Sequence, residues 1–182
     1  MSEVALERFI EQTRSAWGPL STELVATLSH GLEGLLAASP FERWMADLSR
    51  DRPAQVDLHR DGDLGFLLLG HAEQAGLYRP PHDHGRSWVL YGILEGEIEM
   101  GTYARFELPD GKDRLVRRGS TVLRAGQVQA YLPGDIHDTC CLTRSALLLR
   151  FTERDLKLDA VNGYPVTRYV QQRGAGTTSA AA

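Results

Sequence analysis

The chain has 182 residues and a formal net charge of −4, with no block of basic residues. This length suits one domain with a sizeable core, and the charge balance favours neither a nucleic-acid partner nor an anionic membrane. No apolar run is long enough to span a bilayer, and MSEVALERFIEQ lacks the layout of a signal peptide. The two cysteines, Cys140 and Cys141, are adjacent, so reduced thiols and a cytoplasmic location are expected.

Helices are predicted throughout the first part of the chain. Residues 2–17 place apolar residues among acidic ones at a spacing that fits an amphipathic helix. Ser21 can cap a second helix that reaches about residue 38, and Pro40 opens a short third one, FERWMADLS. We expect this helical segment, residues 1–52, to pack on the rest of the domain and to hold no catalytic group. Its aromatic residues supply the expected contacts: Trp17, Phe41 and Trp44.

From about Ala54 onward, short apolar runs alternate with Gly, Pro and Asp, a pattern typical of an all-β sandwich or barrel. The predicted strands are Val56 to Arg60, Gly65 to Leu69, Leu77 to Arg79, Ser87 to Leu94, Glu97 to Phe106, Thr121 to Arg124, Val128 to Leu132, Cys140 to Leu142, Ala146 to Phe151 and Pro165 to Tyr169. Their number suits a jelly roll of two Greek keys over residues 53–170. The small and polar tail, residues 171–182, is expected to be disordered.

Residues able to hold a metal ion are concentrated in the stretch GLYRPPHDHGRSWVLYGILEG. In a strand, His82 and His84 point to one face while Asp83 points to the other, so two imidazoles converge. A third ligand has to come from elsewhere, and His137 lies in a comparable turn, LPGDIHD. Three nitrogen ligands leave coordination positions open for a substrate or for oxygen, as expected of a catalytic site.

The spacing of these residues resembles the two cupin motifs. The run G-x5-HDH, which begins at Gly76 and continues to Gly96, matches the first motif. The run from Gly126 through LPG to His137 matches the second. Two positions depart from that second motif, where a proline and an asparagine are usual: Leu132 and Cys141.

The usual metal-binding glutamate of the first motif is missing, because its position falls on Trp88 or Val89. Among cupins, a three-His site behind an HDH run is similar to the cysteine dioxygenase family of thiol dioxygenases, over roughly residues 56–152. The resemblance implies a cupin jelly-roll β-barrel (double-stranded β-helix) with N-terminal helices. It also implies an Fe(II) centre that adds both oxygen atoms of O2 to the sulfur of a small thiol. Imidazole suits several metals, so Zn, Ni, Cu or Mn could occupy the purified protein.

An arginine is the expected substrate ligand. Arg60, in LHRDG, lies shortly before the first motif, where thiol dioxygenases keep an arginine that binds the substrate carboxylate through a bidentate fork. The alternative is a surface arginine paired with Asp61 or Asp63. Arg150, which interrupts the apolar run ALLLRF, is the second candidate. We therefore expect an acidic thiol such as cysteine, held by Arg60 before Arg150.

The resemblance breaks at the position of the family's catalytic tyrosine. Arg150 and Thr152 stand where the family has a pocket histidine and that tyrosine, and Val89 replaces the cysteine that some members cross-link to it. No such cross-link can form here. Tyr91 shares a face with Val89 and could supply a hydroxyl to the pocket, with core packing as the alternative.

Two further functions stay open. One is a three-His cupin dioxygenase that cleaves carbon–carbon bonds of a small diketone or phenol, and the other is a non-enzymatic cupin that binds a small molecule or metal. The expected partners are a small-molecule substrate and O2, in a monomer or a homodimer. Of the remaining histidines, His59 or His71 could orient a ligand imidazole.

Overall fold

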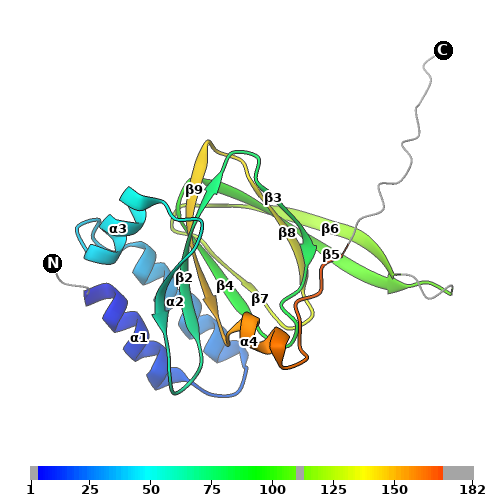
Figure 1. The fold of residues 1–182 in the computed structure, drawn as a ribbon, viewed down its shortest axis with the longest axis horizontal. Helices are drawn as coiled ribbons and strands as arrows, with labels where there is room; N and C mark the ends of the chain where they lie inside the picture. Colours follow the sequence, from blue (N-terminus) through cyan, green and yellow to red (C-terminus); the bar gives the residue numbers. More distant parts are fainter. Residues whose placement is uncertain (1–3, 110–112, 170–182) are drawn as a thin grey trace, which may run out of the picture.

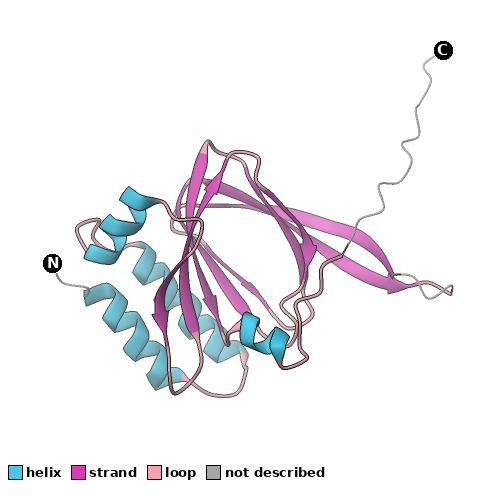
Figure 2. Ribbon diagram, in the orientation of Figure 1, coloured by secondary structure: helices cyan, strands magenta, loops and turns pink. Residues whose placement is uncertain are grey.

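The computed structural model describes residues 4–109 and 113–169. Three N-terminal helices lie against one side of a β-barrel (Figures 1 and 2): α1 (Val4–Ala16), α2 (Thr22–Leu36) and α3 (Arg43–Asp51). The tail for which we expect disorder, 171–182, lies outside the described residues. No helix in the described part of the chain is long and apolar enough to cross a membrane.

The predicted helices are present, with one difference at the third. Ser21 caps α2 as predicted, because its side-chain oxygen accepts a hydrogen bond from the Leu24 amide at 3.1 Å. Trp44 is buried, and the Trp17 ring lies 5.2 Å from that of Phe66 at the start of the barrel. Phe41, however, is 79% exposed, because α3 begins two residues later and leaves Phe41 in the preceding loop. Its expected packing role is wrong.

The barrel consists of two antiparallel sheets with strand orders β1-β2-β9-β4-β7 and β3-β8-β5-β6. The strands are β1 (Val56–Arg60), β2 (Leu67–Gln74), β3 (Tyr78–His82), β4 (Val89–Glu95), β5 (Glu97–Glu107), β6 (Asp113–Arg124), β7 (Val128–Tyr131), β8 (Ile136–Cys141) and β9 (Ser145–Thr152). With β1 set aside as an added edge strand, the other eight divide equally between the sheets, as in a jelly roll of two Greek keys. The predicted fold, a double-stranded β-helix of the cupin type, is confirmed.

Strand alternation explains why β9 reads as an almost continuous apolar run. Leu147, Leu149 and Phe151 face the core shared with the helices. Ala146 and Leu148, in the alternate positions, belong to a second apolar cluster inside the barrel. Because both faces of the strand are covered, the run from Ala146 to Phe151 is apolar at every position except Arg150. The same alternation directs Arg150 to the inside of the barrel.

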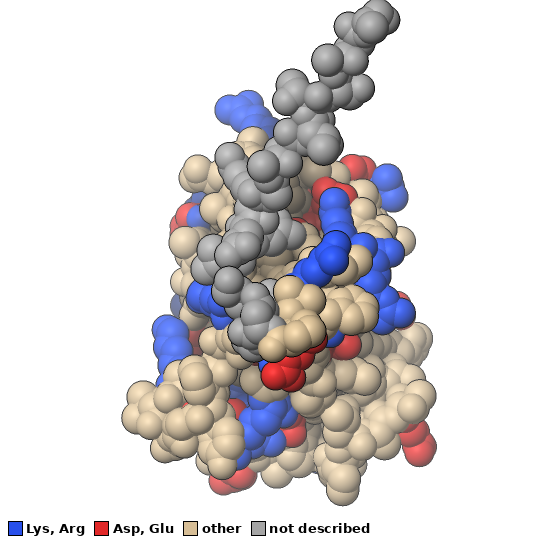
Figure 3. Space-filling model, turned by 90° about the vertical axis from the view of Figure 1, so that its right-hand side faces the viewer, with Lys and Arg blue, Asp and Glu red and all other residues tan. Residues whose placement is uncertain are grey.

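The long hairpin of β5 and β6 extends beyond the barrel (Figure 1). Strand β6 begins well before the predicted Thr121, because arginines fill its exposed first half and hide the strand pattern. Two arginines pair with acids on β5: Arg117 lies 2.9 Å from Glu99, and Arg124 lies 3.1 Å from Glu97. Viewed from the side of this hairpin, acidic side chains lie among the basic ones (Figure 3). Charges of this kind discourage another strand from adding to an open sheet edge.

The end of the described chain differs from the prediction. A helix that we did not predict, α4 (Leu156–Val161), begins where the Asp155 side chain accepts a hydrogen bond from the Lys157 amide at 2.8 Å. The predicted strand Pro165 to Tyr169 is wrong, since only an isolated bridge joins Arg168 to His82. This segment, residues 164–169, is called the closing segment below.

Candidate metal centre and its cavity

Three histidines meet inside the barrel. His82 is the last residue of β3, His84 lies in the turn that follows, and His137 lies on β8 directly opposite His82 in the strand register. All three are buried, and one potential ligand atom from each lies within 4.8 Å of the others. The structure therefore brings together the three predicted ligands, and no carboxylate or thiol of the described residues joins this cluster.

The hydrogen bonds of these imidazoles leave nitrogen atoms free to ligate. The Nδ1 atom of His82 lies 2.8 Å from the Pro80 carbonyl oxygen, which can only accept, so Nδ1 carries the hydrogen and Nε2 keeps its lone pair. Within the described residues, Nδ1 of His84 and both ring nitrogens of His137 are buried without a hydrogen-bond partner. Buried polar atoms of this kind are costly unless something binds them. A divalent metal ion fits this set of donors.

The three imidazoles are neutral at physiological pH. Burial, together with smaller contributions from neighbouring histidines and Arg150, lowers the pKa of His84 to about 3 and that of His137 to about 2. Burial likewise lowers the pKa of His82. Neutral imidazole is the form that ligates a metal, so the folded chain presents the cluster ready for binding.

Aspartates fix the ligand-bearing segments from outside. Asp83 points away from the two histidines that flank it, and its Oδ1 accepts hydrogen bonds from the amides of Gly85 and Thr167, both at 2.9 Å. Its Oδ2 accepts one from the Tyr169 hydroxyl at 3.0 Å, which ties the closing segment to the HDH turn. Asp138, next to His137, is buried and accepts a hydrogen bond from the Gly101 amide at 2.9 Å. The positions of the ligands are therefore largely set before any metal binds.

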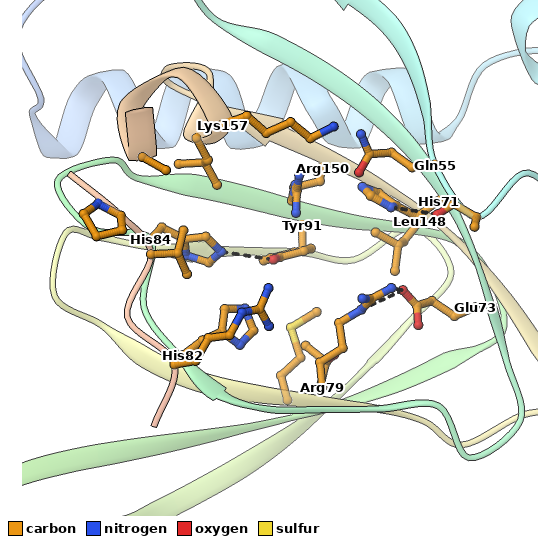
Figure 4. A pocket seen from close by; sticks show the side chains of 18 residues that line it. Gln55, His71, Glu73, Arg79, His82, His84, Tyr91, Leu148, Arg150 and Lys157 are labelled. Atoms are coloured by element: carbon orange, nitrogen blue, oxygen red, sulfur yellow. Dashed lines mark hydrogen bonds and ion pairs between the residues drawn. The ribbon is translucent and has the colours of Figure 1, made fainter. Parts of the chain in front are cut away.

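The histidine cluster borders a cavity of about 580 Å³ (Figure 4). The cavity is lined by side chains from the facing sheets, from α4 and from the closing segment, among them Met100, Thr139, Leu148, Leu156, Pro165 and Val166. Its charged residues are Glu73, Arg79, Arg150, Lys157 and Arg168. Glu73 is paired with Arg79 at 2.7 Å, whereas no described carboxylate lies within ion-pair distance of the other three cations. The cavity therefore favours an anionic ligand.

Arg150 and Tyr91 stand side by side on the inner face of the barrel. They are register partners on β9 and β4, and Figure 4 shows both pointing into the cavity. The Nε atom of Arg150 is buried without a hydrogen-bond partner in the described chain. The Tyr91 hydroxyl lies 3.2 Å from Nε2 of His84. Tyr91 thus both packs in the apolar interior and presents its hydroxyl beside a candidate ligand.

Arg60 does not reach this cavity. It lies on the edge strand β1, where it pairs with Asp155 and, at 3.0 Å, with Asp57. It lines a small hollow of about 30 Å³ next to the cavity. Strand register places Arg150 inside the barrel, whereas Arg60 has carboxylate partners outside, so of the two predicted arginines only Arg150 lines the cavity. The predicted alternative partner, Asp61, instead binds Arg14 at 2.7 Å.

The departures from the thiol dioxygenase pattern lie side by side in the structure. Val89 and Thr152 are register partners on β4 and β9, and both are buried, so the position of the family's cross-link is filled by a pair that cannot form one. The Cys141 thiol is buried in the apolar interior, where burial raises its pKa. Neither Cys140 nor Cys141 lines the cavity.

Several cavity residues were not predicted. Alternation along β2 places His71 and Glu73 on the inner face, a signal that becomes readable only when the strand register is known. Lys157 lies in the first turn of α4, a helix that was not predicted. Asp155, which caps this helix, is the residue in the sequence that could have indicated its start. Neither remaining histidine orients a ligand imidazole, because His71 binds the Ala54 carbonyl and His59 lies 3.5 Å from Asp61.

Acidification should destabilise the metal-free protein between about pH 6.5 and 3. Burial lowers the pKa of His71 to about 3, like that of His84. In this window these histidines are therefore protonated in the unfolded chain and neutral in the folded chain. Each such histidine should lower the free energy of unfolding by about 1.4 kcal/mol per pH unit. Urea unfolding of chelator-treated protein measures the slope. The exposed His30→Ala variant should keep it and His137→Gln should reduce it, whereas a flat profile in the parent would contradict the burial argument.

No protein-family model and no curated protein matches the chain. Among solved structures, the Schizosaccharomyces pombe Cnp3 cupin domain has a TM-score of 0.44 at 14% identity, covering 60% of this chain and 69% of that one. KdgF from Halomonas sp. has a TM-score of 0.43 at 15% identity, with 57% and 81% covered. Oxalate oxidase in complex with glycolate has a TM-score of 0.44 at 18% identity, with 63% and 55% covered. These likenesses concern the fold alone.

Proposed function

We propose that the protein is a mononuclear non-haem iron dioxygenase that oxidises the thiol of a small carboxylate-bearing substrate, such as cysteine or a related thiol, to a sulfinate. One observation carries the proposal. Three neutral, buried imidazoles converge on one spot, and two of them, His82 and His84, line a cavity that also holds Arg150, a guanidinium without a carboxylate partner in the described chain. A metal ion with open positions and a fixed cation together suit a ligand with a donor atom at one end and an acid at the other.

In this proposal the three histidines hold Fe(II) through one ring nitrogen each. When bound, the iron would supply the activation of O2 and the binding of the thiol sulfur. The reaction balances without a further reductant, because a thiolate and one O2 give one sulfinate, with both oxygen atoms on sulfur. Iron has to be loaded in the test, since three imidazoles alone do not select it over zinc, nickel or copper.

The remaining cavity residues position the substrate. Arg150 binds the carboxylate through its planar fork, which fixes the distance between the acid and the histidine cluster. Burial raises the pKa of Tyr91, so its hydroxyl stays protonated at neutral pH and can donate. That hydroxyl contacts Nε2 of His84 in the metal-free chain. Tyr91 also lines the cavity, so its hydroxyl can donate to a substrate bound there.

Oxygen consumption with defined thiols tests the proposal. Iron-loaded protein should consume O2 with cysteine or another acidic thiol and release a sulfinate that carries two atoms from isotopically labelled O2, as measured by mass spectrometry. Zinc-loaded protein is the matched control and should consume none. Carbon-chain fragments from a diketone or phenol, without sulfinate, would replace the proposal by carbon–carbon cleavage. No O2 uptake by the iron-loaded protein with any of these compounds would favour a binding protein.

A further inference from the structure

His71 presents a hydrogen-bond acceptor that nothing in the described chain satisfies. Its side chain points from β2 into the cavity (Figure 4), and the residue is only 6% exposed. Nδ1 lies 3.1 Å from the Ala54 carbonyl oxygen, so Nδ1 carries the hydrogen and Nε2 keeps a lone pair. Within the described residues, Nε2 is buried without a partner. A buried acceptor in this position is costly unless a ligand donates to it.

The ring of His71 does not gain a proton near neutral pH, so Nε2 remains an acceptor. Burial lowers its pKa to about 3, and the positive charge of Arg150 contributes in the same direction. The imidazole therefore stays neutral, with a donor toward Ala54 and an acceptor toward the cavity. The tautomer is set by the backbone carbonyl on the opposite side of the ring.

Arg150 supplies the complementary group on the adjacent strand. His71 is paired with Leu148 in the register of β2 and β9, and Arg150 lies two residues beyond Leu148 on the same face. Diagonal neighbours of this kind are separated by about 7–8 Å between their Cα atoms, within reach of long side chains. Each of the two side chains has a buried nitrogen without a partner in the described chain, a donor on Arg150 and an acceptor on His71. A ligand that satisfies both needs an acid group with a hydrogen-bond donor close to it.

We propose that His71 determines specificity by accepting, at Nε2, a hydrogen bond from an ammonium or hydroxyl group next to the acid group of the substrate. The preferred class is then a 2-amino or 2-hydroxy acid that carries the thiol, rather than a simple mercapto acid. This inference rests on the proposed function for the thiol. The recognition itself is a binding event and requires no oxidation.

Binding without oxygen separates this inference from the proposed reaction. Iron-loaded protein is titrated calorimetrically, under anaerobic conditions, with three thiols that differ at one position: cysteine, 3-mercaptolactate and 3-mercaptopropionate. The parent should bind the first two about ten- to a hundred-fold more tightly than the third, since the third leaves Nε2 unpaired. Equal affinity for all three, or no affinity for any, overturns the inference. The first of these outcomes leaves sulfinate formation untouched.

Two substitutions distinguish His71 from other sources of the same preference. In His71→Asn, the side-chain amide can still donate to the Ala54 carbonyl but does not reach as far as Nε2, so the preference should fall to within about twofold. In His71→Gln, the longer amide places an oxygen near the former Nε2 and should restore part of the preference. Iron content and thermal unfolding verify that both variants remain folded and loaded. A preference that persists unchanged in His71→Asn would show that another group, such as the iron, recognises the amine or hydroxyl, and would overturn the inference.

Discussion

Replacing His137 with alanine should remove most of the iron from the purified protein. His137 is fully buried, has both ring nitrogens free of hydrogen-bond partners in the described chain, and lies opposite His82 in the strand register. Loss of one of three ligands should weaken metal binding by more than about 100-fold, since even residues that only support a ligand cost about 10- to 100-fold. Elemental analysis after iron loading measures the effect.

The His137 ring stacks on Tyr131 with 3.8 Å between centroids, so alanine also leaves a hole in the interior. His137→Gln fills more of that space and should lose the metal as well, which separates ligation from packing. His30→Ala removes a histidine whose side chain is 86% exposed and should retain full occupancy. One iron per chain in both His137 variants would remove this residue from the ligand set and break the assignment.

Replacing Arg150 with alanine should lower kcat/KM for an acidic thiol by about ten- to two-hundred-fold. The bidentate hydrogen bonds to a carboxylate in a partly dry cavity are worth about 1.5 to 3 kcal/mol, which corresponds to this range. Lysine should rescue poorly, because a point charge lacks the planar fork. Steady-state oxygen uptake with saturating O2 gives kcat and KM separately.

Arg60→Ala is the matched control, since it removes the same side chain from the outer edge strand of the same sheet. It should change kcat/KM by less than about twofold. Impairment in Arg60→Ala and not in Arg150→Ala would restore the order expected from sequence. Parental activity in both variants would mean that the substrate is not an acid.

The metal ligands were predictable because their information is local. His82 and His84 are two residues apart, and His137 lies in a turn with its own glycine and proline pattern. The amphipathic helices and most strands follow from periodicity in the same way. Beyond that, the cupin resemblance was needed to pair the two histidine segments, since spacing alone says nothing of which strands become neighbours.

The arginines show where local information ends. Arg60 and Arg150 both lie in predicted strands, and the sequence does not show which one faces the interior. Arg150 faces the interior because β9 lies between β2 and β4 in the sheet. Arg60 is held outside because Asp155, at the start of a helix that was not predicted, pairs with it. His71 was similarly ambiguous until its register opposite Leu148 was known. Long-range pairing, rather than residue type, decides these positions.

The strand order of the two sheets also has a consequence for synthesis. The sheet that carries His82 and His137 contains β3, β8, β5 and β6, so the residue of this sheet that is synthesised last is Cys141. The facing sheet lacks the strand between β2 and β4 until β9 has emerged from the ribosome, and α4 and the closing segment come later still. Chains are made from the N-terminus at about 5–20 residues per second. All three histidines therefore leave the ribosome before Arg150 on β9, and before α4 and the closing segment that help to line the cavity.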